Sequence, residues 1–549
     1  MNIRSLTLAF LLATLPSAAF AQATFTKITT GAVVTDSTLS QNCAWGDFNN
    51  DGFVDLFVAN YNSAATARNS VYQNNGDGTF TKLTTNSIAT AGGSFSSGVW
   101  ADWDNDGLLD LYVVDYRGAN SFYRNLGNGA FARVPASLTP MPRTPGDFYG
   151  GAAWGDYDKD GFVDLFVSLP GINNVLYRNI GDGTFAEAAA SAVTDEGGSS
   201  TTGLWGDYDD DGHLDLFVPN GHSESDFLYR NNGDGTFAKM TDGSVISDDV
   251  ESWGSAWGDY NNDGYLDLAV AVYGDARLPG RSLLYRNSGD GAFELVSDSV
   301  IGAAAAGSVA CAWGDYDNDG FLDLFMANGL NGNARNFLFH NNGDGTFSKI
   351  TSGPPVNESV ESIGAAWGDY DNDGFLDLYV ANGNSSSQRN HLFHNDGNSN
   401  NWLNVKLVGT ISNRSAIGAK VRVKAPIKGK TFWQLREISG TGQNDLRASF
   451  GLGDAVVAEI VRIEWPSGIV QELHNVTARQ FLTVTESLQI TMTSLGRLRV
   501  HGANDVDYAV EVSEDLSRWT RAGAVKGGAE FVDAQAERRA ARFYRAVAP

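Results

Sequence analysis

The stretch WGDYDNDGFLDLFMANG, residues 313–329, decides the fold of this chain, because it occurs seven times with light variation. The copies of its acidic loop begin at Asp47, Asp102, Asp156, Asp207, Asp259, Asp315 and Asp369. Successive starts are separated by 55, 54, 51, 52, 56 and 54 residues. An internal repeat of this kind is typical of a propeller or a solenoid.

Each repeat contains short β-rich runs separated by turn signals. In the fourth repeat we expect strands at 203–205, 214–219, 227–230 and 237–240, with the hairpin signal Asn232-Gly233-Asp234-Gly235 between the last two. Asn and Gly tolerate the positive φ that such tight hairpins need. Four antiparallel strands in each of seven repeats predict an all-β, seven-bladed β-propeller.

The two ends of the repeat region predict how the ring closes. The seventh repeat lacks a fourth strand after residues 391–394, whereas residues 23–28 match the fourth strand at 78–83. We therefore expect the N-terminal strand to complete the last blade and to remove an exposed sheet edge. One tryptophan per repeat (Trp45, Trp100, Trp154, Trp205, Trp257, Trp313, Trp367) is interpreted as packing between blades rather than as a ligand-stacking ring.

The acidic loops have the ligand pattern of a hard cation. Asp or Asn occupies loop positions 1, 3 and 5, Gly occupies position 6, and Asp occupies position 9. Position 7 is expected to offer its backbone carbonyl. Several oxygen ligands without Cys favour Ca²⁺ over transition metals, and flexible coordination disfavours Mg²⁺. The predicted ligands are Asp47, Asn49, Asp51, Phe53 and Asp55; Asp102, Asp104, Asp106, Leu108 and Asp110; Asp156, Asp158, Asp160, Phe162 and Asp164; Asp207, Asp209, Asp211, His213 and Asp215; Asp259, Asn261, Asp263, Tyr265 and Asp267; Asp315, Asp317, Asp319, Phe321 and Asp323; and Asp369, Asp371, Asp373, Phe375 and Asp377.

The loops are not EF-hands, because strands flank them and position 12 of the first loop is Val58 rather than Glu. We expect up to seven Ca²⁺ ions, one per blade, with weaker binding where Asn49 and Asn261 replace a carboxylate. Asp210, which lies between ligand positions, is expected to face solvent. Turn chemistry is the preferred interpretation of the Gly-Asp-Gly hairpins.

The repeats resemble the FG-GAP/VCBS family, which is best known from integrin α-subunit propellers and whose members hold Ca²⁺ through loop positions 1, 3, 5 and 9. After the repeats, the segments 401–407, 417–421, 450–453 (FGLG) and 464–468 (EWPSG) resemble an ASPIC/UnbV domain. This order of domains resembles the cartilage acidic protein family and its bacterial relatives, although Ser449 stands where relatives often have His. The resemblance implies a propeller at 22–400 and a β-rich ASPIC/UnbV domain at 401–487. Residues 488–549 alternate apolar and polar side chains and are expected to form a small β-sandwich-like unit.

The N-terminus has the pattern of a secretory signal. A charged start, an apolar run from Leu6 to Leu15 and the sequence Ala19-Phe20-Ala21 predict a signal peptide at 1–21. The run is shorter than the roughly 20 residues of a membrane span, and no later segment is a candidate transmembrane helix. We therefore expect a secreted, periplasmic or cell-surface protein. The two cysteines, Cys43 and Cys311, are expected to pack as small buried side chains rather than to form a disulfide.

Charge is divided unevenly between the two parts of the chain. The whole chain carries a net charge of −27, and residues 1–401 hold 50 Asp/Glu against 18 Lys/Arg, which argues against a nucleic-acid partner. The ASPIC/UnbV-like region carries a basic cluster (Lys420, Arg422, Lys424, Lys428, Lys430). A solvated strand edge is its simpler interpretation, and docking against the acidic ring is the alternative.

No HExxH, G-x-S-x-G or phosphate-loop motif occurs. The favoured function is an extracellular binding or adhesion module for a glycan or a protein, with recognition on the variable loops opposite the acidic loops. The competing hypothesis is a carbohydrate-active enzyme, such as a polysaccharide lyase, on the same loops. Candidate partner-binding residues in the loops between second and third strands are Arg68, Arg117, Arg277, Arg281, Arg335 and Arg389, for which solvated loop arginines are the simpler interpretation. The oligomeric state is not predicted.

Overall fold

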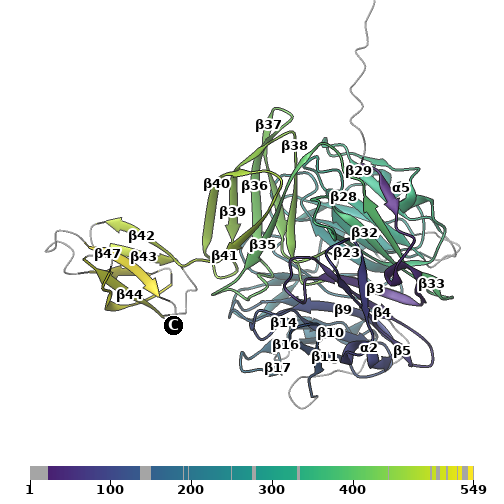
Figure 1. Cartoon of the computed structure of the whole chain (residues 1–549), viewed down its shortest axis with the longest axis horizontal. Helices are drawn as coiled ribbons and strands as arrows, with labels where there is room; N and C mark the ends of the chain where they lie inside the picture. Colours follow the sequence, from purple (N-terminus) through teal and green to yellow (C-terminus); the bar gives the residue numbers. More distant parts are fainter. Residues whose placement is uncertain are drawn as a thin grey trace, which may run out of the picture.

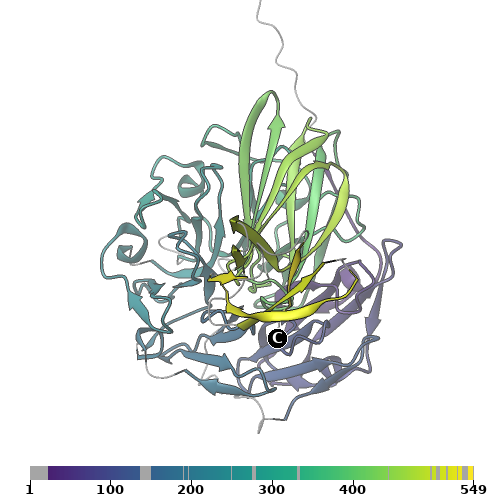
Figure 2. The same ribbon diagram turned by 90° about the vertical axis from the view of Figure 1, so that its left-hand side faces the viewer.

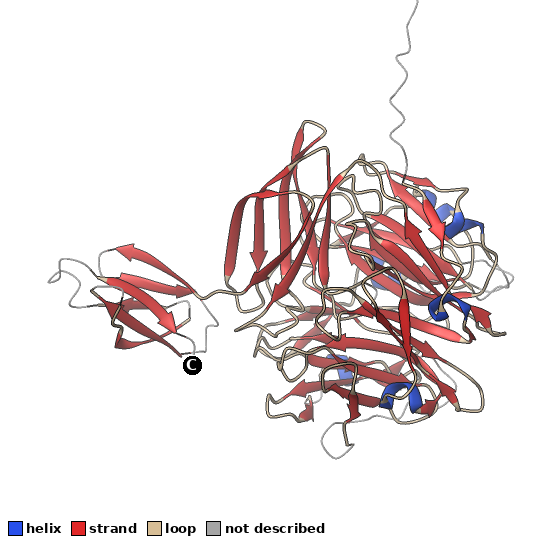
Figure 3. Ribbon diagram, in the orientation of Figure 1, coloured by secondary structure: helices blue, strands red, loops and turns tan. Residues whose placement is uncertain are grey.

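The computed structural model describes residues 23–135, 150–188, 191–195, 197–248, 250–274, 280–329, 334–442, 444–494, 497–501, 507–514, 517–527, 529–533 and 542–547. The predicted signal peptide at 1–21 and the candidate residue Arg277 lie outside these ranges. The described part of the chain is almost entirely β-structure (Figures 1 and 3).

Seven four-stranded antiparallel sheets, here called the repeat sheets, contain one acidic loop each. The first strands are β3 (Ser40–Gly46), β9 (Phe95–Ala101), β13 (Ala152–Gly155), β19 (Leu204–Gly206), β23 (Ser252–Gly258), β27 (Ser308–Gly314) and β31 (Ser362–Gly368). The second strands are β4 (Asp55–Asn60), β10 (Asp110–Asp115), β14 (Asp164–Val167), β20 (Asp215–Val218), β24 (Asp267–Val272), β28 (Asp323–Asn328) and β32 (Asp377–Asn382).

The outer half of each repeat sheet is a hairpin. The third strands are β6 (Ser70–Asn74), β11 (Ser121–Asn125), β16 (Val175–Asn179), β21 (Phe227–Asn231), β25 (Leu283–Asn287), β29 (Phe337–Asn341) and β34 (His391–Asn395). The fourth strands are β7 (Phe80–Leu83), β12 (Phe131–Arg133), β17 (Phe185–Glu187), β22 (Phe237–Lys239), β26 (Phe293–Leu295), β30 (Phe347–Lys349) and β1 (Phe25–Lys27). The four strands expected in the fourth repeat are therefore present.

The fourth strand of the last repeat sheet comes from the start of the chain. β1 pairs antiparallel with β34, with Phe25 opposite Asn395 and Lys27 opposite Phe393. The first strands also contact one another in the order β3, β9, β13, β19, β23, β27, β31, and β31 returns to β3. The expected N-terminal pairing is thus observed within a β-propeller-like arrangement of sheets.

The repeat tryptophans connect each sheet to the previous one. Each indole Nε1 donates a hydrogen bond of 3.1 to 3.4 Å to a backbone carbonyl of the preceding first strand. Trp100 bonds Ala44, for example, and Trp45 bonds Ala366 of the last sheet, so the series returns on itself. Gly46, which follows Trp45, lies against Trp100, where a Cβ atom would come within 2.9 Å of the indole. These contacts support the interpretation of the tryptophans as packing between sheets.

Short helices and two-residue strands lie in the connections of the repeat sheets. Four-residue helices follow the fourth strands: α1 (Ala32–Thr35), α2 (Ser87–Thr90), α3 (Ala192–Asp195), α4 (Ser244–Ser247), α5 (Val300–Ala303) and α6 (Pro354–Asn357). Sequence periodicity did not predict them, because one helical turn is too short to show a period. Two-residue strands β2 (Ser37–Thr38), β5 (Ala67–Arg68), β8 (Gly92–Gly93), β15 (Ile172–Asn173), β18 (Gly197–Gly198) and β33 (Gln388–Arg389) pair as β5 with β8, β15 with β18 and β2 with β33. Cys43 and Cys311 are both buried and free, as expected.

The segment after the repeat sheets forms two further sheets. One has the order β38-β35-β41, with β35 (Asn401–Val408), β38 (Arg447–Gly453) and β41 (Gln480–Thr485), and its β35 and β41 are parallel. The other has the order β37-β36-β39-β40, with β36 (Lys420–Ile427), β37 (Lys430–Glu437), β39 (Val457–Glu464) and β40 (Val470–Thr477). Their shared core includes Leu403, Val421, Phe450 and Val461.

The last part of the chain contains two three-stranded antiparallel sheets (Figures 1 and 2). They comprise β42 (Gln489–Ser494), β43 (Arg497–His501), β44 (Asp507–Ser513), β45 (Thr520–Lys526), β46 (Glu530–Val532) and β47 (Phe543–Val547). Tyr508 and Val510 are buried in a small core of their own. Among the residues that the structure describes, no helix is long and apolar enough to span a membrane.

Candidate metal loops and the domain that covers them

The acidic loops join the first strand of each repeat sheet to the second. Loop position 4 has a left-handed backbone, with φ between 56° and 59°, and the Gly at position 6 has φ between 88° and 98°. This double turn curls the loop, so that side chains at alternate positions converge. Oxygen atoms from positions 1, 3 and 9 lie within 4.8 Å of one another in loops 102–110, 156–164 and 207–215. The structure therefore brings together the carboxylates that the sequence pattern selected.

The two carboxylate oxygens of the aspartate at position 1 have different surroundings. In loop 207–215, Oδ2 of Asp207 accepts a 2.8 Å hydrogen bond from the backbone N–H of Gly212. Its Oδ1 is buried and has no hydrogen-bond partner. The Oδ1 atoms of Asp47 and Asp156 are equally buried and unpartnered. A buried carboxylate oxygen without a donor is costly unless a cation binds it, so these orphan atoms fit a metal ion inside the loop.

The aspartate at position 9 is held by the backbone. In the first loop, Asp55 accepts hydrogen bonds from the N–H of Phe48 (3.1 Å) and of Asn74 (2.8 Å). Burial, with the neighbouring carboxylates of Asp47 and Asp51, raises the pKa of Asp55 to about 8. Burial likewise raises the pKa of Asp215 to about 9. Crowded acidic groups of this kind favour protonation or cation binding.

The residues at positions 5 and 7 stabilise the loop itself. Position 5 accepts a hydrogen bond from the backbone N–H of position 7, as in Asp211 with His213 at 2.9 Å. The side chain at position 7 packs over the glycine of the next hairpin; a Cβ atom on Gly233 would lie 2.6 Å from the His213 ring. This close approach explains a glycine of the Gly-Asp-Gly hairpins. The predicted role of the position 7 carbonyls as ligands remains a prediction.

The third strand places a basic residue beside most loops. Arg178 lies 2.5 Å from Asp158 and 2.9 Å from Asp160, and Arg124 and Arg230 make equivalent pairs. His340 and His394 occupy the same place in the last two sheets, and each lies 3.2 Å from the position 9 aspartate. In the first and fifth loops, where position 3 is Asn, the equivalent residues are Gln73 and Arg286, and Arg286 pairs with Glu294 instead. The third-strand residue thus varies with the charge of the loop.

An asparagine at the end of each third strand was missed as a site residue. Asn231 Nδ2 donates to the carbonyls of Leu214 in its own loop (3.1 Å) and of Tyr157 in the preceding loop (2.8 Å). Its equivalents, which make the same pair of bonds, are Asn74, Asn125, Asn179, Asn287, Asn341 and Asn395. The available signal was the recurrence of Asn after Tyr-Arg or Phe-His in the repeats.

Asparagine at position 4 joins neighbouring loops. Its Nδ2 donates to the carbonyl of the glycine in the next loop in five cases: Asn50 to Gly107, Asn105 to Gly161, Asn262 to Gly320, Asn318 to Gly374 and Asn372 to Gly52. Asp210 occupies this position in the fourth loop and has no donor to offer. Arg422 of β36 lies between the fourth and fifth loops, donating to Asp210 (2.9 Å) and to the carbonyl of Gly264 (3.0 Å). The second domain therefore supplies the missing connection.

Asp210 is 41% exposed, as expected, and it also forms ion pairs with Lys420 and Arg422. Because of these ion pairs, the interpretation of the basic cluster as a solvated strand edge is wrong in part. Lys420 is buried against Asp207 and Asp210, and Lys428 lies 3.3 Å from Asp319. The acidic loops attract these cations, so docking against the acidic ring is the arrangement that occurs.

Other contacts extend this interface around the loops. Lys406 lies 3.2 Å from Asp47. Arg447 donates to Asn372 Oδ1 and to the carbonyl of Asp369, both at 3.0 Å. The backbone N–H of Gly451 donates to Asp315 Oδ2 at 3.1 Å. The domain formed by β35–β41 thus lies on the same face as the candidate metal loops.

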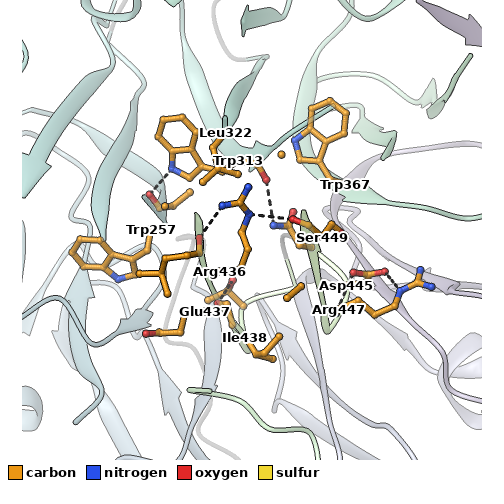
Figure 4. A pocket seen from close by; sticks show the side chains of 18 of the residues that line it. Trp257, Trp313, Leu322, Trp367, Arg436, Glu437, Ile438, Asp445, Arg447 and Ser449 are labelled. Atoms are coloured by element: carbon orange, nitrogen blue, oxygen red, sulfur yellow. Dashed lines mark hydrogen bonds and ion pairs between the residues drawn. The ribbon is translucent and has the colours of Figure 1, made fainter. Parts of the chain in front are cut away.

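Residues 438–442 and 444–446, between β37 and β38, enter the centre of the ring of first strands and are here called the plug. The carbonyl of Gly440 accepts a 3.2 Å hydrogen bond from the N–H of Trp154, and Asn444 Nδ2 donates to the carbonyl of Trp313. At the base of the plug, the half-buried Arg436 side chain lies among Trp257, Trp313 and Trp367 (Figure 4). Arg436 Nε donates to the carbonyl of Ser449 at 3.2 Å. The plug fills the axis of the ring from the metal-loop face.

The candidate partner-binding arginines lie on the opposite side of the repeat sheets. Arg68 and Arg389 belong to the short strands β5 and β33, and Arg281 and Arg335 form isolated β-bridges with Ala305 and Ser359. Arg117 Nη1 donates to the carbonyl of Ser63 at 2.6 Å. Their predicted role in partner binding remains a prediction.

Comparisons with known proteins agree with this architecture. The model for the FG-GAP-like repeat matches residues 47–113, 102–167, 172–218, 207–270, 271–326 and 322–380, more than half of the chain. The chain belongs to the FG-GAP-like repeat family. The ASPIC and UnbV model matches residues 409–490 of this FG-GAP-like repeat protein.

The FG-GAP-like repeat protein is homologous to cartilage acidic protein 1. It is 31% identical to the Homo sapiens protein over 287 residues, covering 50% of this chain and 42% of the relative. Identity to the Mus musculus protein is 29% over 331 residues, covering 58% and 48%. The chain therefore spans less than half the length of these relatives. Similar solved structures include an Agrocybe aegerita lectin that recognises non-reducing terminal N-acetylglucosamine (TM-score 0.40, 18% identity, 59% and 84% covered) and BBS1N in complex with ARL6DN (TM-score 0.43, 13% identity, 67% and 96% covered).

Proposed function

We propose that this chain is an exported, calcium-stabilised binding module for an extracellular glycan or protein. In this proposal, residues 1–21 direct export, residues 22–400 form a closed seven-bladed propeller, residues 401–487 form the ASPIC/UnbV domain, and residues 488–549 form a separate small β unit. Each blade holds one Ca²⁺ ion, up to seven in all.

The orphan carboxylate oxygens carry the calcium part of the proposal. Oδ1 of Asp47, Asp156 and Asp207 is buried without a donor, although the other oxygen of each residue accepts the glycine N–H of its own loop. Hard oxygen ligands from positions 1, 3, 5 and 9 suit Ca²⁺. When bound, the ion would neutralise carboxylates that otherwise repel one another, and the loop residues would keep their mutual hydrogen bonds.

The position of the second domain carries the binding part. Because the ASPIC/UnbV domain lies against the metal loops through Lys406, Lys420 and Arg447, recognition is assigned to the opposite loops, whose sequences vary between repeats. Variable loops on a rigid scaffold are common binding surfaces.

Two measurements test the proposal. Titration of metal-free protein with Ca²⁺, followed by calorimetry and native mass spectrometry, should give several bound ions, whereas Mg²⁺ at the same concentration should not replace them. Binding to a glycan array and capture of extracellular proteins should require the folded, Ca²⁺-loaded chain. A protein that binds no Ca²⁺, or whose partners bind equally well after chelation and unfolding, would contradict it.

A further inference from the structure

A cavity of about 130 Å³ opens on the ring axis at the end opposite the metal loops. Residues of all seven repeats line it, among them Gln41, Ser96, Gly151 and Thr202. Thr441 of the plug lines both this cavity and the cavity around Arg436, so the plug forms its floor. The ring and the plug together therefore make a closed-bottomed pocket at the mouth of the ring, here called the mouth pocket.

Bulges in the first strands direct side chains toward the mouth pocket. The pairing of first and second strands skips one residue at the same point in five repeat sheets: Gln41, Ser96, Trp253, Val309 and Ile363. All five skipped residues line the pocket. A bulge re-aims a side chain at a fixed place in a sheet. The scaffold is thus repeated, while the side chain at the bulge differs in every case.

This combination is the opposite of what the metal loops display. Loop positions 1, 3, 5 and 9 are Asp or Asn in every repeat, as a role in stability requires, whereas the bulge residues comprise an amide, a hydroxyl, an indole and two aliphatic side chains. If these bulge positions served only to pack the first strands together, small and aliphatic side chains would be sufficient at all five. A varied set of side chains aimed at one cavity is what the recognition of one particular ligand needs.

The mouth pocket is uncharged. Among its described lining residues there is no Asp, Glu, Lys, Arg or His, in a chain whose net charge is −27. A charged ligand group buried there would lack a counter-charge. The ligand group that enters is therefore neutral.

The pocket has one apolar wall and one polar wall. Trp253, Val309 and Ile363 belong to one hydrophobic cluster, and the Trp253 ring lies 5.5 Å from that of Tyr273. On the polar side, Gln41 is only 4% exposed and its Oε1 has no hydrogen-bond partner, although its Nε2 donates to Gly383. Asn42 Oδ1 and Ser97 Oγ are likewise buried and unpartnered. The polar residues that line the pocket, among them Asn42, Ser96, Thr201 and Thr202, supply amide and hydroxyl groups to meet ligand hydroxyl groups.

We propose that the mouth pocket binds one neutral sugar residue of a glycan. A pyranose ring carries hydroxyl groups at its edge and C–H groups on its face, which match the amide and hydroxyl wall and the Trp253 wall respectively. The volume admits a single residue rather than a longer segment. A peptide terminus would bring a charge that the lining does not balance. This inference rests on the proposed binding function and names its ligand class.

The test uses the full Ca²⁺-loaded chain on an array of neutral and acidic glycans, with hits titrated by calorimetry. Neutral glycans should bind, and Trp253→Ala should weaken their binding about tenfold or more. Thr202→Arg, which places a long charged side chain at the pocket, should abolish binding. Lys430→Ala, at an exposed position of β37 outside the pocket lining, is the control and should bind as the parent does. Arg335→Ala tests the alternative in which the candidate loop arginines, and not the pocket, hold the ligand.

Trp253→Phe guards against a folding effect, since it keeps a ring beside Tyr273; it should melt as the parent does and still bind more weakly. The inference is overturned if only acidic glycans bind, if Arg335→Ala rather than Trp253→Ala removes binding, or if no neutral glycan binds. In that last case, capture of an extracellular protein by the Ca²⁺-loaded chain would leave the proposed binding function standing while the sugar site is rejected.

Discussion

Lys420 Nζ lies 2.7 Å from Asp207 Oδ2, and the two side chains are only 6% and 5% exposed. Lys420 belongs to the ASPIC/UnbV region and Asp207 to an acidic loop, so a buried ion pair joins the two domains. Burial opposes the charge of Lys420, but Asp207, Glu437 and Asp210 together raise its pKa. Lys420 therefore stays charged at neutral pH.

Replacing Lys420 by Glu should separate the two domains. Removing one partner of a buried ion pair costs about 3–5 kcal/mol, and Glu adds repulsion toward Asp207 and Asp210. Limited proteolysis should then cut between residues 396 and 401, and the thermal transition should split in two. Lys430→Glu, at an exposed position of β37, is the control and should leave both readouts unchanged. A single unchanged transition in Lys420→Glu would show that the pair does not hold the domains together.

Gly440→Val should have a related effect by a steric route. A Cβ atom on Gly440 would lie 2.4 Å from the carbonyl oxygen of Trp154, so a branched side chain prevents the plug from entering the ring. We expect the repeat sheets to fold, and small-angle scattering to report a larger radius of gyration. Thr441→Ser, in the same plug, should match the parent. Equal radii for Gly440→Val and the parent would contradict the tight fit of the plug.

Chelation of Ca²⁺ should lower the melting temperature, and more so at pH 8 than at pH 5.5. When the free Ca²⁺ concentration is 100 times the Kd of a site, binding at that site stabilises the fold by about 2.7 kcal/mol. In the metal-free chain, burial and neighbouring carboxylates raise the pKa of Asp55, Asp102 and Asp110 to about 8, 7 and 9. Because these folded pKa values lie above the ordinary value of 3.8, metal-free stability falls as pH rises from about 4 and levels off only at pH 7 to 9. Differential scanning fluorimetry with EDTA and with excess Ca²⁺ measures both effects, and a melting curve indifferent to both would exclude the calcium role.

Asp226→Asn should stabilise the protein at neutral pH. Asp226 precedes β21, where five other repeats have Asn (Asn69, Asn120, Asn174, Asn336 and Asn390). Its Oδ1 accepts from the N–H of Asn220 and its Oδ2 from Ser252, and Asn174 shows that an amide makes equivalent bonds. Burial raises the pKa of Asp226 to about 8.

The direction of the stability change follows from the linkage between protonation of Asp226 and folding. Since the folded pKa lies above the ordinary value of 3.8, the Asp226 carboxyl destabilises the fold increasingly as pH rises from about 4 to 8. The gain from Asn should therefore be small at pH 4 and about 2–4 kcal/mol at pH 7. Urea unfolding at the two pH values measures it, with Ca²⁺ present throughout. A gain that is independent of pH would contradict the buried charge as its cause.

Repetition explains which parts of the molecule could be predicted from the sequence. The loop ligands, the tryptophans and the pairing of residues 23–28 with the last repeat all rest on comparing one copy with another. Asn231 and its equivalents repeat just as regularly, yet their link between neighbouring loops is invisible without coordinates, because it joins residues 74 to 81 apart, or 296 apart for Asn74.

The features that were not predicted occur once. Arg422, Gly440 and Lys420 belong to a domain without internal repeats, and their contacts with the acidic loops span more than 150 residues of sequence. The bulges were also missed, since Gln41, Trp253 and Ile363 share no residue type, and only strand register reveals their common place.

The pairing of β1 with β34 sets an order on assembly of the chain. Phe25 meets Asn395, so the first strand to be synthesised must wait for some 370 further residues before it finds its partner. Once β34 has been synthesised, it presents an open edge until β1 pairs with it, and another chain can add a strand there. Closing so long a loop also slows folding. Completion of the ring is therefore a late event in folding. At a higher concentration of incompletely folded chains, β1 of one chain pairs more often with β34 of another chain instead of with its own.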